Sequence, residues 1–335
     1  MKKTYFPDKY KPNMSLYETQ ECISLIKRTF QKRLSKALHL KRVSAPLFVE
    51  ANSGLNDDLN GVEEAVNFKI PGAGKKGAIV HSLAKWKRMA LYEYDFFVGN
   101  GLYTDMNAIR KDEELDNLHS IYVDQWDWEK VITREERNMT TLRKYVELIH
   151  GCILETLEEV KKKYPQIKTK INKRLYFISS EELLKRFPDL DPKEREDRIA
   201  REKKSVFITG IGNKLSDGKA HDGRAPDYDD WDLNGDLIYY DEVLDCAIEL
   251  SSMGIRVDER SLDRQLHESG HDDRRKYRYH QMILKGELPL TIGGGIGQSR
   301  LCMLLMNKAH IGEVQSSLWD DDTIMKAREK GVIIL

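Results

Sequence analysis

The feature that most constrains the fold is a glycine-rich stretch at residues 291–300, which reads Thr-Ile-Gly-Gly-Gly-Ile-Gly-Gln-Ser-Arg. A β-type lead-in before it and an apolar segment after it predict a strand, a glycine loop and a buried helix. Glycines allow positive φ and close approach of the backbone to a ligand. The amides at the start of a helix offer an anion site. The stretch is therefore either a nucleotide-binding loop with Arg300 as its cation, or a tight turn with a surface arginine.

Two well-known phosphate loops are excluded for this stretch. It lacks the Gly-Lys-Ser or Gly-Lys-Thr ending of a P-loop. Position 298 is Gln, so the dinucleotide fingerprint fails when it is started at Gly293. The choice between a ligand loop and a plain turn depends on the rest of the chain.

Composition excludes several classes of protein. Lys+Arg and Asp+Glu both number 55, and a chain without basic excess is not expected to carry a large nucleic-acid surface. No apolar run follows the basic residues near the N-terminus, so we expect neither a signal peptide nor a membrane span. The four cysteines are far apart in the sequence, which argues against zinc and disulfides and fits the cytoplasm.

Periodicity predicts an alternation of helices and short strands. We expect helices at about residues 15–40, 82–94 and 140–163, strands at 66–70, 78–81, 99–110, 120–128 and 206–209, and a final short strand and helix within 313–335. Ser82 is expected to cap the second helix. By composition alone, the cations of that helix, Lys85, Lys87 and Arg88, form a solvated face.

Acidic residues are concentrated in two places. Asp124, Gln125 and Asp127 lie on the strand at 120–128, where Asp is disfavoured, so we expect these side chains to face a cavity. Residues 221–236 contain six aspartates and little to bury. This second segment is either a solvated loop or an active-site lid.

Two carboxylates form a candidate magnesium site. Residues 236–240 and 246–251 read as neighbouring antiparallel strands, and Glu249 stands between apolar residues, so it points away from the core. Asp236 begins the other strand. If both face the same way, they form an oxygen-donor pair that phosphate oxygens and water complete around Mg²⁺.

Together these pieces resemble the catalytic core of class II aminoacyl-tRNA synthetases. Residues 15–48 are similar to the first motif of that class, a long helix and a Pro-ending strand at the dimer interface. Arg110 with the acidic loop after it and the strand at 120–128 resemble the second motif. Residues 293–306 resemble the third. The resemblance implies an α+β fold with an antiparallel β-sheet flanked by helices.

Longer phrases resemble the ammonia-dependent aspartate–ammonia ligase family within that class. They are His-Ser-Leu-Ala-Lys-Trp-Lys-Arg (81–88), Val-Asp-Gln-Trp-Asp-Trp-Glu (123–129), Arg-Ala-Pro-Asp-Tyr-Asp-Asp-Trp (224–231), Glu-Leu-Ser-Ser-Met-Gly-Ile-Arg-Val-Asp (249–258) and the glycine stretch itself. The family converts aspartate, ATP and ammonia to asparagine, AMP and pyrophosphate with Mg²⁺. The resemblance implies one catalytic domain over residues 1–335, no anticodon-binding module, and a homodimer.

The resemblance also implies roles for residues of this chain. Arg110, Arg300 and Asp58 would be catalytic, and Asp236 and Glu249 would hold Mg²⁺. The aspartate-binding set would be Asp58, Ser82, Lys87, Gln125, Asp127, Asp229 and Arg256. The nucleotide-binding set would be Arg110, Asp112, Glu113, Ser120, Ile121, Asp236, Leu250, Ser251, Gly295, Gly297 and Arg300, with the choice between Asp112 and Glu113 for adenine left open.

The nitrogen source can be argued from chemistry. Neutral ammonia is needed for attack, so a carboxylate must accept a proton from ammonium. Asp58 or Asp229 could do this, and Asp58 is favoured. Glutamine-using synthetases resemble enzymes with Cys directly after Met1, whereas the second residue here is Lys2. The alternatives are an aspartate-activating tRNA synthetase paralogue and a nonenzymatic regulator that binds aspartate or AMP.

Overall fold

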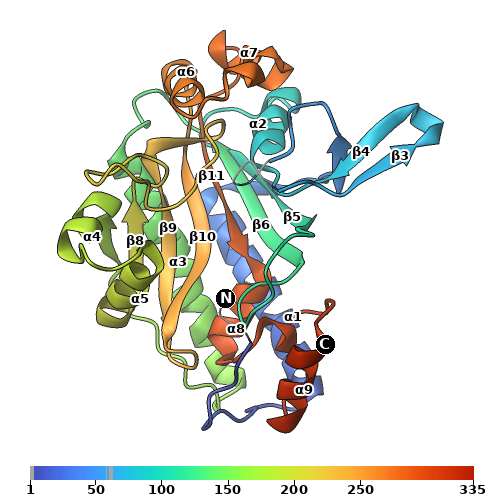
Figure 1. The fold of residues 1–335 in the computed structure, drawn as a ribbon, viewed down its shortest axis with the longest axis vertical. Helices are drawn as coiled ribbons and strands as arrows, with labels where there is room; N and C mark the ends of the chain where they lie inside the picture. Colours follow the sequence, from blue (N-terminus) through green and yellow to red (C-terminus); the bar gives the residue numbers. More distant parts are fainter. Residues whose placement is uncertain (1–3, 58, 60–62) are drawn as a thin grey trace.

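The computed structural model describes residues 4–57, 59 and 63–335, and it is built around an eight-stranded sheet (Figure 1). In spatial order the strands are β1 (Leu40–Arg42), β5 (Gly101–Ile109), β6 (Tyr122–Val131), β11 (Thr291–Gly297), β10 (Cys246–Arg256), β9 (Asp229–Asp241), β8 (Ser205–Thr209) and β7 (Tyr176–Ser179). Pairing is antiparallel from β5 to β8. Both edge pairs, β1 with β5 and β7 with β8, are parallel. The predicted antiparallel sheet is therefore right for the centre and wrong at the two edges.

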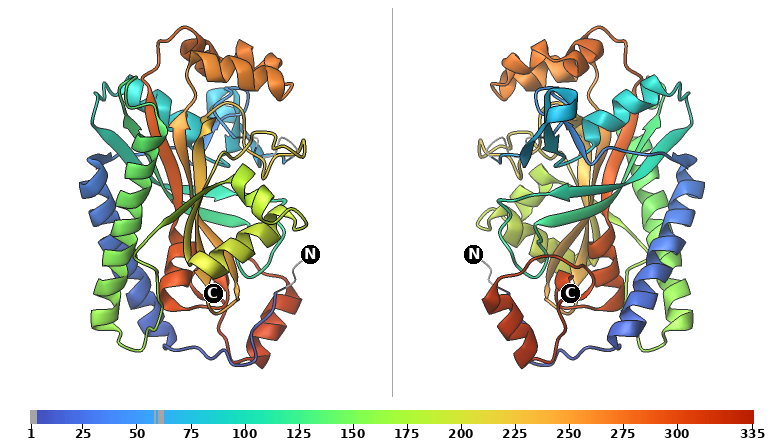
Figure 2. Two further views of the ribbon diagram at one scale, coloured as in Figure 1. Left: turned by 90° about the vertical axis from the view of Figure 1, so that its left-hand side faces the viewer. Right: turned by 90° about the vertical axis from the view of Figure 1, so that its right-hand side faces the viewer.

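One face of the sheet is covered by three helices. These are α1 (Leu16–Leu38), α3 (Met139–Lys163) and α8 (Gln298–Met306), of which α1 and α3 run side by side in Figure 2. The helix at 15–40 is confirmed with its capping box, in which the Ser15 hydroxyl accepts from the Glu18 amide. Trp126 and Trp128 of β6 point into this layer and are fully buried. Alternation along a strand then sends the residues between them to the opposite face.

The opposite face is only partly covered. The helices α4 (Ser180–Arg186) and α5 (Pro192–Lys203) pack over the β7–β9 end around Ile199, Val206 and Ile238. A three-stranded sheet of β2 (Phe48–Glu50), β4 (Lys75–Ile79) and β3 (Asn67–Ile70), with a 3₁₀ turn at Pro71–Ala73, projects from the other end (Figure 1). The centre of this face is left to the cavity described below.

A helical unit closes one end of the sheet. It comprises α2 (Ala84–Glu93), α6 (Glu259–Glu268), a 3₁₀ turn at Asp272–Lys276 and α7 (Arg278–Leu284), which cluster together in Figure 1. A small core that includes Met89 of α2, Leu262 and Leu266 of α6 and Ile283 of α7 joins these helices. The unit therefore fixes α2 against the segment that follows β10.

Several local predictions are wrong. The cap of α2 is Leu83 and no side chain bonds there, although the Ser82 hydroxyl accepts from the Ala84 amide at 3.3 Å. Lys85, Lys87 and Arg88 are buried rather than solvated, each at most 3% exposed. Within the described residues, the tail contains a 3₁₀ turn at Ile311–Glu313 and α9 (Asp321–Glu329) but no strand after Gly297.

Residues 221–236 are not a solvated loop. Asp227, Asp229 and Asp230 are 0–3% exposed. The strand β9 begins at Asp229, seven residues earlier than predicted, so Asp236 lies in its middle. Among the described residues, no helix is long and apolar enough to cross a membrane.

Candidate active site

A cavity of about 400 Å³ opens on the sheet face opposite α1 and α3. It brings together most of the residues that the sequence singled out. Those that line it are Ser82, Lys87, Arg110, Glu113, Ser120, Gln125, Asp127, Asp229, Asp236, Glu249, Leu250, Arg256, Gly295, Gly297 and Arg300. Asp58 lies outside the described residues. Asp112 lines only an adjoining hollow of about 320 Å³ and pairs with Lys111, which leaves Glu113 as the acid of that loop in the main cavity.

Strand β6 supplies the floor of the cavity. Gln125, Asp127 and Glu129 alternate with the buried tryptophans and so share the open face of the sheet. Gly295 of β11 lies directly opposite Asp127. A Cβ at Gly295 would come within 2.3 Å of the Gln125 Oε1 atom. A larger residue there would displace the side chains of Gln125 and Asp127, which lie across the β11 backbone.

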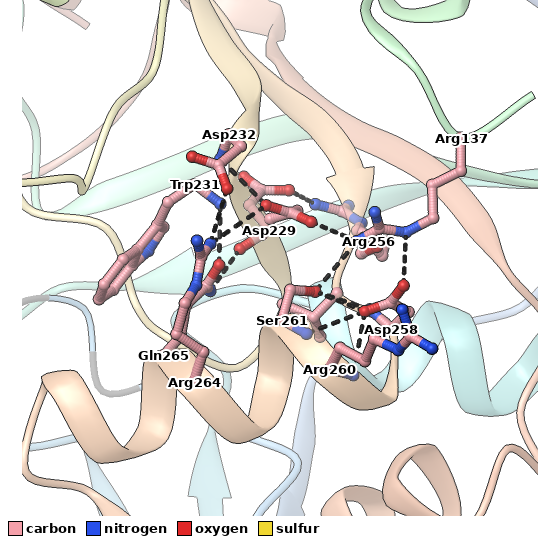
Figure 3. A network of polar contacts seen from close by, with 12 residues as sticks. Arg137, Asp229, Trp231, Asp232, Arg256, Asp258, Arg260, Ser261, Arg264 and Gln265 are labelled. Carbon is pink, nitrogen blue, oxygen red and sulfur yellow. Dashed lines mark hydrogen bonds and ion pairs between the residues drawn. The ribbon is translucent and has the colours of Figure 1, made fainter.

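An arginine forms the charged centre of one end of the cavity. The Arg256 guanidinium donates to both carboxylate oxygens of Glu129 at 2.8–3.0 Å. It also pairs with Asp229 on the neighbouring strand (Figure 3). It lies 5.7 Å from the ring centre of Tyr228. Glu129 is fully buried. Burial alone would raise the pKa of Glu129, but Arg256 outweighs it and holds the pKa below its usual value.

Lys87 extends from α2 to the same end. Its Nζ lies 3.2 Å from the Asp127 Oδ1 and 3.1 Å from the Gly294 carbonyl. Burial lowers the pKa of Lys87, and Asp127 opposes that shift. This end of the cavity therefore presents two fixed cations among carboxylates, an arrangement that suits a zwitterion with an additional carboxylate.

The predicted carboxylate pair lies at the other end. Asp236 and Glu249 both line the cavity, although Asp236 is paired with Ser252 and Glu249 with Ile238. They share a face because Ile238, opposite Glu249, is two residues from Asp236 on β9. A β-bulge between Glu249 and Ser251 then reverses the alternation along the rest of β10. The same bulge turns Ser251 toward the core, opposite Leu237 and Ile296. Ser252 takes the cavity position predicted for Ser251.

The charges around this pair fit a divalent cation. Burial raises the pKa of Asp236 above its usual value; Arg224, 2.5 Å away, opposes the shift, and the Glu249 carboxylate adds to it. Arg300 holds the pKa of Glu249 below its usual value against burial. Within the described residues, no cluster of three or more His, Cys, Asp or Glu forms a protein-only metal cage. Two crowded carboxylates that face a cavity match a Mg²⁺ site completed by phosphate oxygens and water.

Two further arginines point into this end. Arg300 donates to the Glu249 carbonyl at 2.9 Å and to the Leu118 carbonyl at 3.4 Å. Arg110 lies 3.9 Å from Glu113 and is about one-quarter exposed. Both line the cavity beside Asp236 and Glu249. Ile121 does not line it, but its carbonyl accepts from the Arg110 amide at 2.9 Å and so fixes that arginine.

The glycine stretch differs from its prediction in two respects. None of the glycines at positions 293–297 has positive φ, because they form the strand β11 rather than a loop. The start of α8 is not open to an anion, since the Ser299 amide donates to the Asp124 carboxylate at 3.0 Å. Protein side chains, such as that of Gln125, approach the β11 backbone closely. Close approach of a ligand stays a prediction, and the helix-terminus anion site is wrong.

Sequence reasoning missed several residues that line the cavity, among them Arg224, Tyr228 and Lys193. Arg224 and Tyr228 stand in a phrase that resembles the family, so that phrase was the available signal. Lys193 of α5 reaches the cavity from a helix that carried no chemical signal. Asp124 was expected to face the cavity, but its role in holding α8 requires a contact with Ser299 that only the fold reveals.

A family model described as aspartate-ammonia ligase matches residues 17–331. The chain belongs to the aspartate–ammonia ligase family. The aspartate–ammonia ligase of Clostridium perfringens strain 13 is 55% identical over 336 residues, and the match covers 100% of both chains. That of Ligilactobacillus salivarius is 55% identical over 331 residues, with 98% of each chain covered.

Solved structures show the class II synthetase fold. The asparaginyl-tRNA synthetase of Pyrococcus horikoshii, complexed with asparaginyl-adenylate, matches with a TM-score of 0.64 at 16% identity. The match covers 94% of this chain and 75% of the synthetase. The Entamoeba histolytica enzyme, also with asparaginyl-adenylate, gives a TM-score of 0.63 at 15% identity, with 90% and 66% covered. The predicted α+β class II core is confirmed.

Proposed function

We propose that this member of the aspartate–ammonia ligase family makes L-asparagine from L-aspartate, ATP and ammonia through a β-aspartyl-adenylate. The products are asparagine, AMP and pyrophosphate. The observation that carries the proposal is a single cavity with an amino-acid end around Lys87 and Arg256 and a phosphate end around Arg110 and Arg300. The family and the fold support the same reaction.

Aspartate selection follows from the charges at the first end. Lys87 and Arg256 bind the α-carboxylate, while Asp127 and Gln125 accept hydrogen bonds from the ammonium group, with Ser82 beside them. Glu129 supports the site by holding Arg256 in place. A buried charge without a partner costs several kcal/mol, so a ligand that lacks the α-carboxylate or the ammonium group is a poor fit.

The first half-reaction occurs at the boundary between the two ends. An oxygen of the β-carboxylate attacks the α-phosphorus, a P–O bond forms, and the bond to the departing pyrophosphate breaks. Negative charge grows on the α-phosphate oxygens in that step, and a fixed cation such as Arg110 stabilises it. Arg300 packs against adenine and reaches the terminal phosphates. The acid contacting the adenine amino group is Glu113, and Ser120, Leu250, Gly295 and Gly297 complete the nucleotide walls.

Asp236 and Glu249 would hold Mg²⁺. When bound, the cation neutralises charge on the triphosphate. Arg224 pairs with Asp236 in the structure described here, so it balances part of the charge of this pair.

The second half-reaction needs a base for ammonium. Asp229 already pairs with Arg256 and lies 3.8 Å from Arg224, so its charge is largely compensated. That supports Asp58 as the carboxylate that accepts the proton. Ammonia then attacks the β-carbonyl carbon, and AMP departs as the C–O bond to phosphate breaks.

The test measures AMP and asparagine with ammonium, and then with glutamine, as the nitrogen source. We expect asparagine and AMP in equal amounts with ammonium, and little product with glutamine. ADP as the product would refute the adenylate. Transfer of aspartate to tRNA would favour the synthetase paralogue, and aspartate binding without turnover would favour the regulator. We also propose a homodimer through residues 15–48 and one catalytic domain over 1–335, which sedimentation and limited proteolysis test.

A further inference from the structure

A short segment brings two residues of the aspartate end into the cavity. Residues 226–231 lead into β9, and within them Tyr228 and Asp229 line the cavity. Asp229 pairs with Arg256, and the ring of Tyr228 faces the same guanidinium. The placement of Arg256 therefore depends on how this segment is held.

A glutamine outside the cavity holds the backbone of that segment at three points. The Gln265 Nε2 donates to the carbonyls of Pro226 and Asp229, both at 2.9 Å. Its Oε1 accepts from the Trp231 amide, also at 2.9 Å (Figure 3). The side chain is fully buried. These contacts bracket Tyr228 and Asp229 from both sides, because they reach the residues before, at and after this pair.

Asp227 of the segment, which does not line the cavity, is also fixed. The Asp227 Oδ2 lies 3.1 Å from the Lys85 Nζ, 2.9 Å from the Arg274 Nη1 and 3.0 Å from the His280 Nε2. Burial would raise the pKa of Asp227, but Lys85, His280 and Arg274 hold it well below its usual value. An ionised anchor therefore joins the segment to α2, the 3₁₀ turn and α7.

Both attachments belong to the same helical unit. Gln265 lies on α6, and His280 lies on α7. Within the unit, α2 is held by Arg88, which donates to the Val257 and Pro289 carbonyls at 2.6 and 2.9 Å. Since α2 carries Lys87, one rigid body sets the positions of both cations at the aspartate end.

We propose that Gln265 is a positioning residue for aspartate binding, which acts by fixing the backbone of residues 226–231 so that Asp229 and Tyr228 orient Arg256. This proposal rests on the proposed function, because it assumes that Arg256 binds the aspartate carboxylate. At the nucleotide end, the backbone amide of Arg110 bonds to Ile121, and the Arg300 guanidinium bonds to Leu118 and Glu249. None of these partners belongs to residues 226–231. The consequence is a loss selective for aspartate.

The experiment compares Gln265→Met with wild type in aspartate-dependent pyrophosphate–ATP exchange, with each substrate varied in turn. Methionine has a similar length but makes none of the three hydrogen bonds. We expect the KM for aspartate to rise about tenfold, as loss of buried hydrogen bonds allows the segment to relax. The KM for ATP should change by less than about twofold. Gln265→Glu, which keeps the contact with Trp231, should shift the aspartate KM in the same direction and serves if Gln265→Met does not fold.

Asn117→Leu is the matched control. Asn117 is a buried amide that accepts from the Tyr5 amide and donates to the carbonyls of Tyr5 and Ala309. The Asn117→Leu variant should have a lower melting temperature without a selective rise in the KM for aspartate. Equal shifts in both KM values for the Gln265 variants, or no shift, would overturn the positioning role. Absence of aspartate-dependent exchange in wild type would instead refute the proposed function.

Discussion

Arg256 offers a test in which stability and activity can be separated. It is 3% exposed, and its partners Glu129 and Asp229 are at most 1% exposed in their side chains. Arg256→Met leaves two buried carboxylates without their shared cation. Removing one partner of a buried ion pair costs roughly 3–5 kcal/mol. An unfolding entropy of about 0.7 kcal/mol/K for 335 residues then gives a fall in Tm of roughly 4–7 °C.

The loss should depend on pH with a definite sign. In the wild type, Arg256 outweighs burial and keeps the pKa of Glu129 low. That pairing stabilises the fold above the unfolded pKa of a glutamate and is lost as the pH falls through the folded pKa. In Arg256→Met, burial raises the pKa of Glu129 without opposition from Arg256. Glu129 then takes up a proton at acid pH, which removes the cost of its unpaired charge. The difference in free energy of unfolding should therefore be larger at pH 8 than at pH 5.

Urea unfolding at the two pH values, together with pyrophosphate–ATP exchange, makes the measurement. Adding Glu129→Gln to Arg256→Met should restore part of the stability by removing a buried charge, but it should not restore aspartate activation. The control is Arg201→Ala, which breaks an exposed pair with Asp245 (side chains 53% and 60% exposed) and should cost less than about 1 kcal/mol. A stability loss of the same size at pH 5 and pH 8 would refute the electrostatic reasoning.

The remaining predictions concern the nucleotide end. Arg110→Ala should lower aspartate-dependent exchange by roughly 10²–10³-fold, because a fixed cation at the reacting phosphate is lost; wild-type exchange in the variant would contradict that role. Asp124→Ala removes the acceptor for the Ser299 amide at 3.0 Å, so it should destabilise the protein by roughly 1–3 kcal/mol in thermal unfolding. It should also raise the KM for ATP through α8, and a KM unchanged from wild type would contradict that link. Lys193→Ala should weaken inhibition by pyrophosphate about fivefold but leave inhibition by AMP unchanged. The control is Lys185→Ala, at an exposed side chain of α4, which should alter neither inhibition.

Local sequence patterns determined much of the architecture. The Ser15–Glu18 box and the apolar spacing after it predicted α1, and the structure confirms both. The aromatic-rich stretch at 120–128 likewise predicted a strand whose Asp124, Gln125 and Asp127 face a cavity, and the structure confirms both. These signals are local because capping and strand alternation depend only on nearby residues. Resemblance over long phrases added the family and the class II fold.

Other features depended on contacts between distant segments. Lys85, Lys87 and Arg88 were expected in solvent, yet each is buried because carboxylates or carbonyls from residues 127–294 reach it. For the aspartates at 227–230 the sequence left a solvated loop and an active-site lid open, because their cationic partners lie in other elements. A charged residue gives the same signal in the sequence whether its side chain faces water or a buried partner.

The sequence by itself determined the family, the main helices and strands, and which residue types supply the chemistry. Only the tertiary structure decided how those residues meet. The bulge after Glu249 places Ser252 rather than Ser251 in the cavity. The register between β6 and β11 places Gly295 beside the Gln125 side chain. The bulge and the register are set by pairing between strands far apart in the chain, and the periodicity within one strand carries no information about its partner.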